Sequence, residues 1–256
     1  MNRKGNTMRN GTKLLLGLGA LAHGVAAWAG FTACPQHFPQ YSPVPVRVPV
    51  GELRELCFDA FAVLHSGESR TPLVVVQRLN AGSLEAARSV SRTDQFYEEG
   101  RLPWRERAKL ASYVRSGYDR GHMAPAAEMP TVNAMAQSFS LANVVPTLPR
   151  VNREVWLEVE RSTRKFVRRA RGEVFTYTGV YFAPGRGQRI GTLWESVRVP
   201  DAIYKLVYDA ADKRAWAFWI ENSPQARMNR PISYELLVER TGIQFLPASA
   251  LRPAQG

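Results

Sequence analysis

One short segment, residues 117–125 (GYDRGHMAP), holds three side chains that could act together on a phosphate: Asp119, Arg120 and His122. The guanidinium of Arg120 can hold a phosphate through a planar fork of donors. The imidazole of His122 can take a proton from water near neutral pH. The two glycines let the backbone bend tightly or approach a ligand closely. The segment therefore offers both halves of a site that cleaves a phosphodiester, a group that holds the anion and a group that activates water.

A second set of polar residues begins thirty positions after His122, where Asn152, Trp156 and Glu160 are spaced i, i+4, i+8 and share a face of a predicted helix. Along the helix axis, Asn152 and Glu160 lie about 12 Å apart, which is too far for both to bind one ion directly. We expect Asn152 to bind a hard cation through its carbonyl oxygen, and Glu160 to hold water in the outer shell of that ion. Magnesium suits this division because it keeps several waters and needs few protein ligands.

Both motifs, with Asn143-Val144-Val145-Pro146 between them, resemble the DNA/RNA non-specific endonucleases. These are ββα-metal nucleases with a His-Me finger, a group that includes secreted bacterial nucleases and endonuclease G. The likeness runs from about Cys57 to Pro247, and further matches are SGY at 116–118, YTG at 177–179, VP at 199–200, YK at 204–205 and TG at 241–242. The resemblance implies an α+β fold with a central, mostly antiparallel sheet flanked by helices.

The resemblance also implies roles for the metal-binding and proton-transferring residues. His122 would be the general base that activates water. Asn152 would be the sole direct protein ligand of a Mg²⁺ ion, with Mn²⁺ as the alternative metal, bridging the scissile phosphate and the leaving 3′-oxygen. Glu160 would order metal-bound water.

Three further residues receive implied roles around the phosphate. Arg120 would stabilise the extra negative charge of five-coordinate phosphorus, as a preorganised cation can. Asn143 would support the phosphate or the base, and Asp119 would position the motif or contact metal-bound water. Two positions depart from the family pattern, because Thr147 stands where Gln is frequent and Glu128 where Asp is frequent. These departures bear on substrate preference and rate.

The implied activity is that of a secreted, Mg²⁺-dependent, sugar-non-specific endonuclease acting on DNA and RNA. Two other functions stay open, a nuclease toxin with a narrower target and a catalytically inactive basic nucleic-acid-binding protein. The net charge of +12 and the isoelectric point near 10.1 are typical of a protein with a polyanionic partner or an anionic membrane surface. Homodimers occur among such nucleases, so a homodimer is left open.

The first 29 residues have the features of a secretory signal. Four basic residues precede the apolar stretch Leu14–Val25, which ends at the small-x-small site Ala27-Trp28-Ala29. An uncleaved anchor is the competing interpretation, although the stretch is short for a membrane span. Cleavage of the leader removes four positive charges from the net +12 and leaves a mature chain at +8. We expect this mature chain to have no stable membrane anchor. We expect it to be located in the periplasm or outside the cell. In such an oxidising compartment Cys34 and Cys57 are expected to form one disulfide.

The elements that must position these residues follow from hydrophobic patterning. The best predicted helix spans residues 150–171, where apolar residues recur at helical spacing up to Gly172, and its Arg161, Arg164, Lys165 and Arg168 line a basic face. Strands are predicted at 57–64, 72–79, 173–182, 202–208 and 215–220, a short helix within 104–114, a helix at 233–240, and a loop at 84–100. We expect an N-terminal arm over residues 30–56 and a single nuclease domain over residues 57–250.

Overall fold

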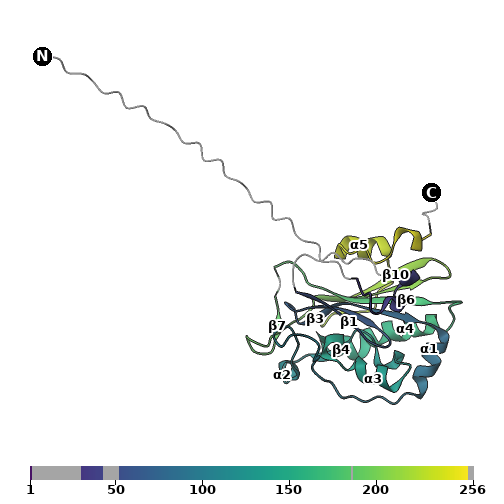
Figure 1. Ribbon diagram of the computed structural model, residues 1–256, viewed down its shortest axis with the longest axis horizontal. Coiled ribbons are helices and arrows are strands. Elements are labelled where there is room, and N and C mark those ends of the chain that lie inside the picture. The colour runs from purple at the N-terminus through teal and green to yellow at the C-terminus, as the bar shows by residue number, and fades with distance from the viewer. Residues whose placement is uncertain (2–29, 43–51, 186, 253–256) are drawn as a thin grey trace.

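A computed structural model of the protein describes Met1 and residues 30–42, 52–185 and 187–252 (Figure 1). The strands are β1 Leu53–Cys57, β2 Ala62–Ser66, β3 Thr71–Leu79, β4 Asp119–His122, β5 Val144–Thr147, β6 Val174–Tyr181, β7 Arg189–Ile190, β8 Val197–Arg198, β9 Ala202–Asp209, β10 Arg214–Glu221 and β11 Ile232–Ser233. The α-helices are α1 Ala81–Ala86, α2 Leu110–Tyr113, α3 Val132–Ser138, α4 Leu157–Val167 and α5 Tyr234–Thr241. A π-helical segment, η6 (Val151–Trp156), leads directly into α4.

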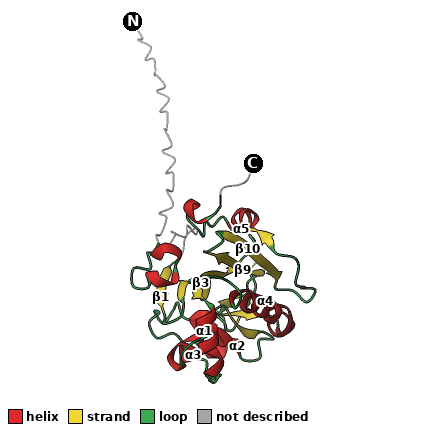
Figure 2. Cartoon of the chain, turned by 90° about the vertical axis from the view of Figure 1, so that its right-hand side faces the viewer, coloured by secondary structure: helices red, strands yellow, loops and turns green. Residues whose placement is uncertain are grey.

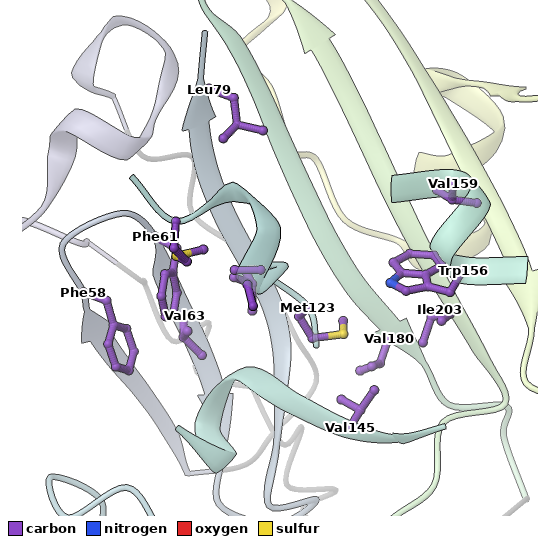
Figure 3. Close-up of a cluster of buried hydrophobic side chains, with 14 of the residues drawn as sticks. Phe58, Phe61, Val63, Leu79, Met123, Val145, Trp156, Val159, Val180 and Ile203 are labelled. Atoms are coloured by element: carbon purple, nitrogen blue, oxygen red, sulfur yellow. The ribbon is translucent and has the colours of Figure 1, made fainter. Parts of the chain in front are cut away.

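Seven strands form one antiparallel sheet in the order β1-β2-β3-β6-β9-β10-β11. Strand residues alternate between its two faces, so each face has its own apolar cluster. One cluster contains Val75, Val180 and Ile203 and packs against Trp156 and Val159 (Figure 3). The other contains Val76, Tyr177 and Tyr204 and lies under α5 and the C-terminal segment. Figures 1 and 2 show α5 on one side of the sheet and α3, α4 and the β4–β5 hairpin on the other. The α+β class and the antiparallel sheet flanked by helices are confirmed.

Residues 30–42 form an arm that is tied to β1. Cys34 and Cys57 form the expected disulfide, with their Cα atoms 5.8 Å apart. The backbone N–H of Phe31 donates to the Glu55 carboxylate at 2.7 Å, and Phe31 and Phe38 are buried against the sheet. The predicted leader, residues 1–29, lies outside the described residues apart from Met1. Among the helices of the described ranges, none has both the length and the apolar character needed to cross a membrane.

The predicted strand over residues 57–64 is wrong in one respect, because it is the junction of two strands. β1 ends at Cys57 and β2 starts at Ala62, and the turn between them is closed by Phe58 N–H donating to the Phe61 carbonyl at 2.9 Å. The rings of Phe58 and Phe61 stack with centroids 4.4 Å apart. Tertiary packing of these two phenylalanines makes an apolar turn stable, and an apolar run alone does not reveal such a turn.

The predicted loop over residues 84–100 also needs correction at its start. Asn80 caps α1 by accepting from Ser83 N–H at 2.8 Å, and the Ser83 hydroxyl accepts from Asn80 N–H at 3.0 Å. This reciprocal pair starts a helix that continues to Ala86. The structure contains the other predicted strands and the short helix before the motif, each with shifted ends. It also contains the two longer predicted helices, residues 150–171 and 233–240, as η6 with α4 and as α5. At the end of α5, Gly242 takes the left-handed conformation, φ 68°, which favours glycine.

Candidate active site

The hairpin of β4 and β5 brings the first motif against the start of η6. In its register Asp119 lies opposite Thr147 and His122 opposite Val144. A Cβ atom at Gly121 would lie 2.4 Å from Thr147 Oγ1 and 3.3 Å from Asn152 Oδ1. Glycine therefore allows the amide of Asn152 to lie directly against the strand, at the position between Arg120 and His122. The two motifs that the sequence separates by thirty residues meet at this point.

Asp119 orients the Asn152 amide. The Nδ2 atom of Asn152 donates to Asp119 Oδ2 at 3.0 Å, and Arg153 donates to both oxygens of the same carboxylate at 2.7 Å. Burial by itself raises the pKa of Asp119, but the hydrogen bonds from Arg153 and Asn152 outweigh it, and the net pKa lies below the ordinary range. With Nδ2 held in this way, Oδ1 accepts no hydrogen bond from the described residues. The carbonyl oxygen is thus the atom left for a cation.

The ring of His122 packs between two phenylalanines. Its centroid lies 5.3 Å from that of Phe96 and 4.9 Å from that of Phe139. Burial, and after it the positive charge of Arg92, lower the pKa of His122 to about 3. The Nε2 atom is buried and has no hydrogen-bond partner in the described part of the chain. The imidazole is therefore neutral at physiological pH and able to accept a proton.

Two arginines lie on the same aromatic pair. The Cζ atom of Arg120 lies 4.4 Å from the centre of the Phe96 ring, and that of Arg92 lies 5.0 Å from the centre of Phe139. Within residues 30–42, 52–185 and 187–252, Arg120 makes no salt bridge, so its guanidinium is available to an anion. Sequence reasoning missed Arg92, Phe96 and Phe139, since the first two lie in the predicted loop and no pattern singled them out.

Glu160 belongs to a buried cluster of charges between α4 and the sheet. Arg164 Nη1 lies 3.8 Å from Glu160 Oε2 and 3.4 Å from Glu128 Oε1. Lys205 is fully buried in β9 and donates from Nζ to Thr178 Oγ1 at 2.6 Å. Burial, reinforced by the negative charge of Glu128, raises the pKa of Glu160 to about 7, while Lys205, Arg164 and Arg92 oppose the rise. Arg92 thus acts electrostatically on both His122 and Glu160.

This cluster corrects the predicted basic face of the long helix. Arg164 points inward with only 11% of its side chain exposed, and it is paired with carboxylates. Arg161, Lys165 and Arg168 are exposed as the pattern indicated. The π-helical segment η6 was also not predicted. Because η6 has i→i+5 bonding, the direction of Asn152 relative to the face of α4 differs from that in a continuous α-helix. Such segments are frequent at functional sites.

Asn143 is fully buried, and its amide is engaged by backbone groups. Its Oδ1 accepts from Ala124 N–H at 2.9 Å, and its Nδ2 donates to the carbonyls of Ala124 and Ser138 at 2.9 Å each. The side chain therefore fixes the backbone two residues after His122 and has no group directed at a ligand. His37 and His65 are buried too, and they contact the carbonyls of Phe58 and Glu106 at 3.0 Å each.

The donor set at Asn152 suits a hard, strongly hydrated cation. In the part of the chain that the structure describes, no three His, Cys, Asp or Glu side chains form a metal-binding group. A site for zinc or another soft metal would need several such ligands. A single amide oxygen, such as Asn152 Oδ1, is a donor of the type that hard cations accept.

The chain is similar in sequence to known nucleases. The sequence profile described as DNA/RNA non-specific endonuclease matches residues 46–250. The chain is 28% identical to the mitochondrial nuclease of Saccharomyces cerevisiae over 212 residues, which cover 73% of this chain and 64% of that protein. It is 31% identical to nuclease C1 of Cunninghamella echinulata over 158 residues, which cover 58% of this chain and 62% of that protein. The matched region thus spans less than two thirds of the length of these relatives.

The fold has a counterpart among solved structures. A crystal structure of the EndoG/EndoGI complex, described as showing the mechanism of EndoG inhibition, superposes with a TM-score of 0.69. Sequence identity is 23%, and the match covers 79% of this chain and 89% of the other. The profile match spans most of the sequence and includes the β4–β5 hairpin, η6 and α4. This protein is a member of the DNA/RNA non-specific endonuclease family.

Proposed function

We propose that the protein is a Mg²⁺-dependent, sugar-non-specific endonuclease that hydrolyses phosphodiester bonds of DNA and RNA. The observation that carries the proposal is the meeting of the two motifs: Asn152 Nδ2 donates to Asp119 Oδ2 at 3.0 Å, and Asn152 Oδ1 lies 3.3 Å from the position that a Cβ atom of Gly121 would take. The strand that carries Arg120 and His122 therefore lies against the oxygen that we propose as the cation ligand. Membership of the family supports the same reaction.

The proposed mechanism assigns one step to each side chain. The imidazole of His122 takes a proton from water, and the resulting hydroxide attacks phosphorus. The bond from phosphorus to the 3′-oxygen breaks, and the released 3′-oxygen takes a proton from solvent water to give the 3′-hydroxyl. Arg120 holds the phosphate and stabilises its added negative charge in the transition state. Arg92, on the other side of the aromatic pair, adds a second positive charge. A bound divalent cation would neutralise charge on the phosphate and on the leaving oxygen.

Lack of sugar and base preference follows from which groups face the substrate. The proposed contacts are a guanidinium, an imidazole and an amide oxygen that acts through a cation, and all of them address phosphate or water. Phosphate contacts carry no sequence information. Discrimination between RNA and DNA would need a contact to the 2′-hydroxyl, and the proposed set contains none.

The proposal is tested by incubating the purified protein with plasmid DNA and with total RNA, each with and without EDTA. We expect both substrates to be degraded and EDTA to stop both reactions. Degradation in EDTA would contradict the metal requirement, and degradation of RNA alone would favour a toxin with a narrow target. Binding of both nucleic acids without cleavage would favour an inactive binding protein.

We also propose that the protein is exported and that it has one nuclease domain. We place a signal peptide at residues 1–29, an arm at 30–56 and one nuclease domain at 57–250, and a periplasmic or extracellular location. The Cys34–Cys57 disulfide supports an oxidising compartment. Several relatives are named mitochondrial, so family membership does not by itself fix the compartment. N-terminal sequencing of the protein from the periplasm or the medium should start at Gly30.

Replacing Asp119 by alanine is expected to lower activity about 10- to 100-fold at low Mg²⁺, because partners that orient a metal ligand have effects of this size. The amide of Asn152 loses its acceptor and can rotate, so a higher Mg²⁺ concentration should recover part of the rate. Asp212→Ala is the matched control, since Asp212 also pairs with arginines but lies away from the motif. A Mg²⁺ dependence equal to that of the unchanged protein would contradict the orienting role.

The pH dependence of the rate should report Glu160. Because its pKa is raised to about 7, the carboxyl becomes protonated as the pH falls through that value, and the rate should fall with it if a carboxylate orders water. Glu128→Gln removes the negative charge that contributes to the rise, so the acid limb should move to lower pH. Glu154→Gln, at an exposed glutamate, should leave the limb in place. If the rate of Glu128→Gln falls at the same pH as that of the unchanged protein, the protonation of Glu160 does not control the reaction.

A further inference from the structure

A hairpin beside the candidate active site presents two large apolar side chains to solvent. β7 and β8 pair, and the turn between them, residues 191–196, carries Leu193 with 83% and Trp194 with 79% of its surface exposed. Single exposed apolar residues are ordinary on protein surfaces. Two adjacent ones at the tip of an ordered turn are a reason to ask what they contact.

The backbone of this tip is held in place by side chains from other elements. Arg70 donates to the carbonyls of Trp194 at 2.8 Å and Ser196 at 3.2 Å, and Ser112 of α2 donates to the carbonyl of Glu195 at 2.6 Å. The Arg70 guanidinium also binds the carbonyl of Arg105 at 2.8 Å. Two separate segments thus fix the turn, whose apolar side chains are exposed, so little conformational entropy is lost when these side chains bind a partner.

The tip is connected to the active site through a small apolar cluster. Ile190 and Val197, which flank the turn, are buried with Val144, and Phe96 packs against the same cluster. Val144 lies opposite His122 in the hairpin, and the Phe96 ring contacts both His122 and Arg120. Leu193 is three positions after Ile190, a reach of about 10 Å. Figure 1 shows β7 and α2 at the same end of the molecule, beside β4.

Several arginines lie around the tip, and Glu68 and Glu195 offset part of their positive charge. Arg70 and Arg189 lie beneath the turn, and burial followed by the charges of Arg70 and Arg198 lowers the pKa of Arg189. Arg105 and Arg115 are exposed on the neighbouring segments. Arginines gathered at this density repel one another, and a polyanion relieves that repulsion. The surroundings of Leu193 and Trp194 therefore fit a nucleic acid.

The apolar area is small for a contact between protein copies. An aromatic side chain buries about 150–250 Å², whereas a standard protein interface takes about 800 Å² from each partner. One indole and one leucine cover less than half of that requirement. The exposed surface of Trp194 and Leu193 is closer in size to the face of one nucleobase. Bases stack on aromatic side chains without regard to sequence.

We propose that Trp194, supported by Leu193, stacks on a base of the nucleic acid whose phosphate is held at Arg120. The tip is a substrate-binding element that anchors the strand a few nucleotides from the bond that is cut. This inference rests on the proposed nuclease function. It predicts that long substrates are favoured over short ones, because a substrate limited to one phosphodiester cannot reach the tip.

Trp194→Ala tests the inference with two substrates. On a single-stranded oligonucleotide of about 30 nucleotides, kcat/KM should fall about 5- to 100-fold, the range for loss of one stacked base. On bis(p-nitrophenyl) phosphate it should stay unchanged, because this compound occupies the catalytic centre alone. Trp194→Phe should retain most of the oligonucleotide activity. Val132→Ala, at a residue of α3 with 72% exposure, is the matched control and should change neither rate.

Salt dependence separates stacking from phosphate contacts. Phosphate contacts weaken as salt rises, whereas stacking does not depend on counterion release. The loss in Trp194→Ala should therefore be the same at 50 and 200 mM salt, and Arg105→Ala should reduce the salt slope by about one.

Four results would overturn the inference: full oligonucleotide activity in Trp194→Ala, an equal loss on both substrates, a loss that vanishes at high salt, or a change from dimer to monomer in sedimentation. If the unchanged protein cleaves neither substrate, the proposed function fails, and oligonucleotide binding in EDTA then decides about the tip. A dissociation constant raised about 5- to 100-fold in Trp194→Ala supports the tip, and an unchanged constant overturns it.

Discussion

Replacing His122 by alanine is expected to lower kcat about 100- to 10,000-fold, the range for loss of a general base. The imidazole is neutral because burial and Arg92 lower its pKa to about 3, so nearly every molecule carries the base in its active form at neutral pH. Initial rates on plasmid DNA at saturating Mg²⁺ measure the loss. Added imidazole should restore part of the rate to the alanine variant, because the space left between Phe96 and Phe139 admits the missing ring.

Folding must be separated from catalysis in this experiment. The His122 ring packs on two phenylalanines, so thermal unfolding of His122→Ala and His122→Gln is measured in parallel. His65→Asn serves as the control, because His65 is fully buried but contacts the carbonyl of Glu106 far along the chain from the motif. We expect that variant to lose stability and to keep its kcat when folded. A His122→Ala variant with a near-normal rate would remove His122 from the mechanism.

A second large loss of activity is expected in two experiments, the replacement of Asn152 by alanine and the removal of the metal from the unchanged protein. A catalytic metal ion contributes several kcal/mol to the transition state, so loss of its only direct protein ligand should lower activity at least about 100-fold at a fixed Mg²⁺ concentration. EDTA should abolish the activity of the unchanged protein, and added Mg²⁺ should restore it. Isothermal titration with Mn²⁺ should give one site that Asn152→Ala weakens.

Asn133→Ala is the matched control for this variant. Asn133 is an exposed asparagine on α3 whose amide donates to Asp59 at 2.5 Å, and within the described ranges its side chain has no hydrogen bond to the motif. Its replacement should leave both activity and Mn²⁺ binding unchanged. Equal Mn²⁺ affinity in Asn152→Ala and the unchanged protein would place the metal elsewhere.

The sequence predicted the long elements that carry the site because their patterns are strong. The stripe through Trp156, Val159 and Thr163 marked the helix, and all three are buried. Runs of β-branched and aromatic residues marked β3, β6 and β9. The motif around His122 and the polar residues from Asn152 onward were predicted to act together, and the hydrogen bond from Asn152 to Asp119 joins the two segments, while the catalytic roles stay predictions.

Features that depend on contacts between distant segments could not be read from the sequence. Arg92 and Phe96 lie in a stretch without periodicity, and only the fold brings them to His122. Asn143 carries the chemistry of a ligand-binding amide, but the backbone of Ala124 and Ser138 uses all of it. Arg164 turns inward toward Glu128, which lies 36 residues earlier in the chain, just after the His122 segment. The helical pattern alone assigns that arginine to the surface.

The central claim is that one phosphodiester meets His122 and a cation on Asn152 at the same time. A crystal structure with Mn²⁺ and a non-cleavable oligonucleotide tests it directly, because Mn²⁺ is located by its anomalous scattering. We predict the ion about 2.1 Å from Asn152 Oδ1, a phosphate in contact with the Arg120 guanidinium, and a water between phosphorus and the His122 ring. An ion bound by other side chains, or a phosphate whose attacking water faces a base other than His122, would contradict the account.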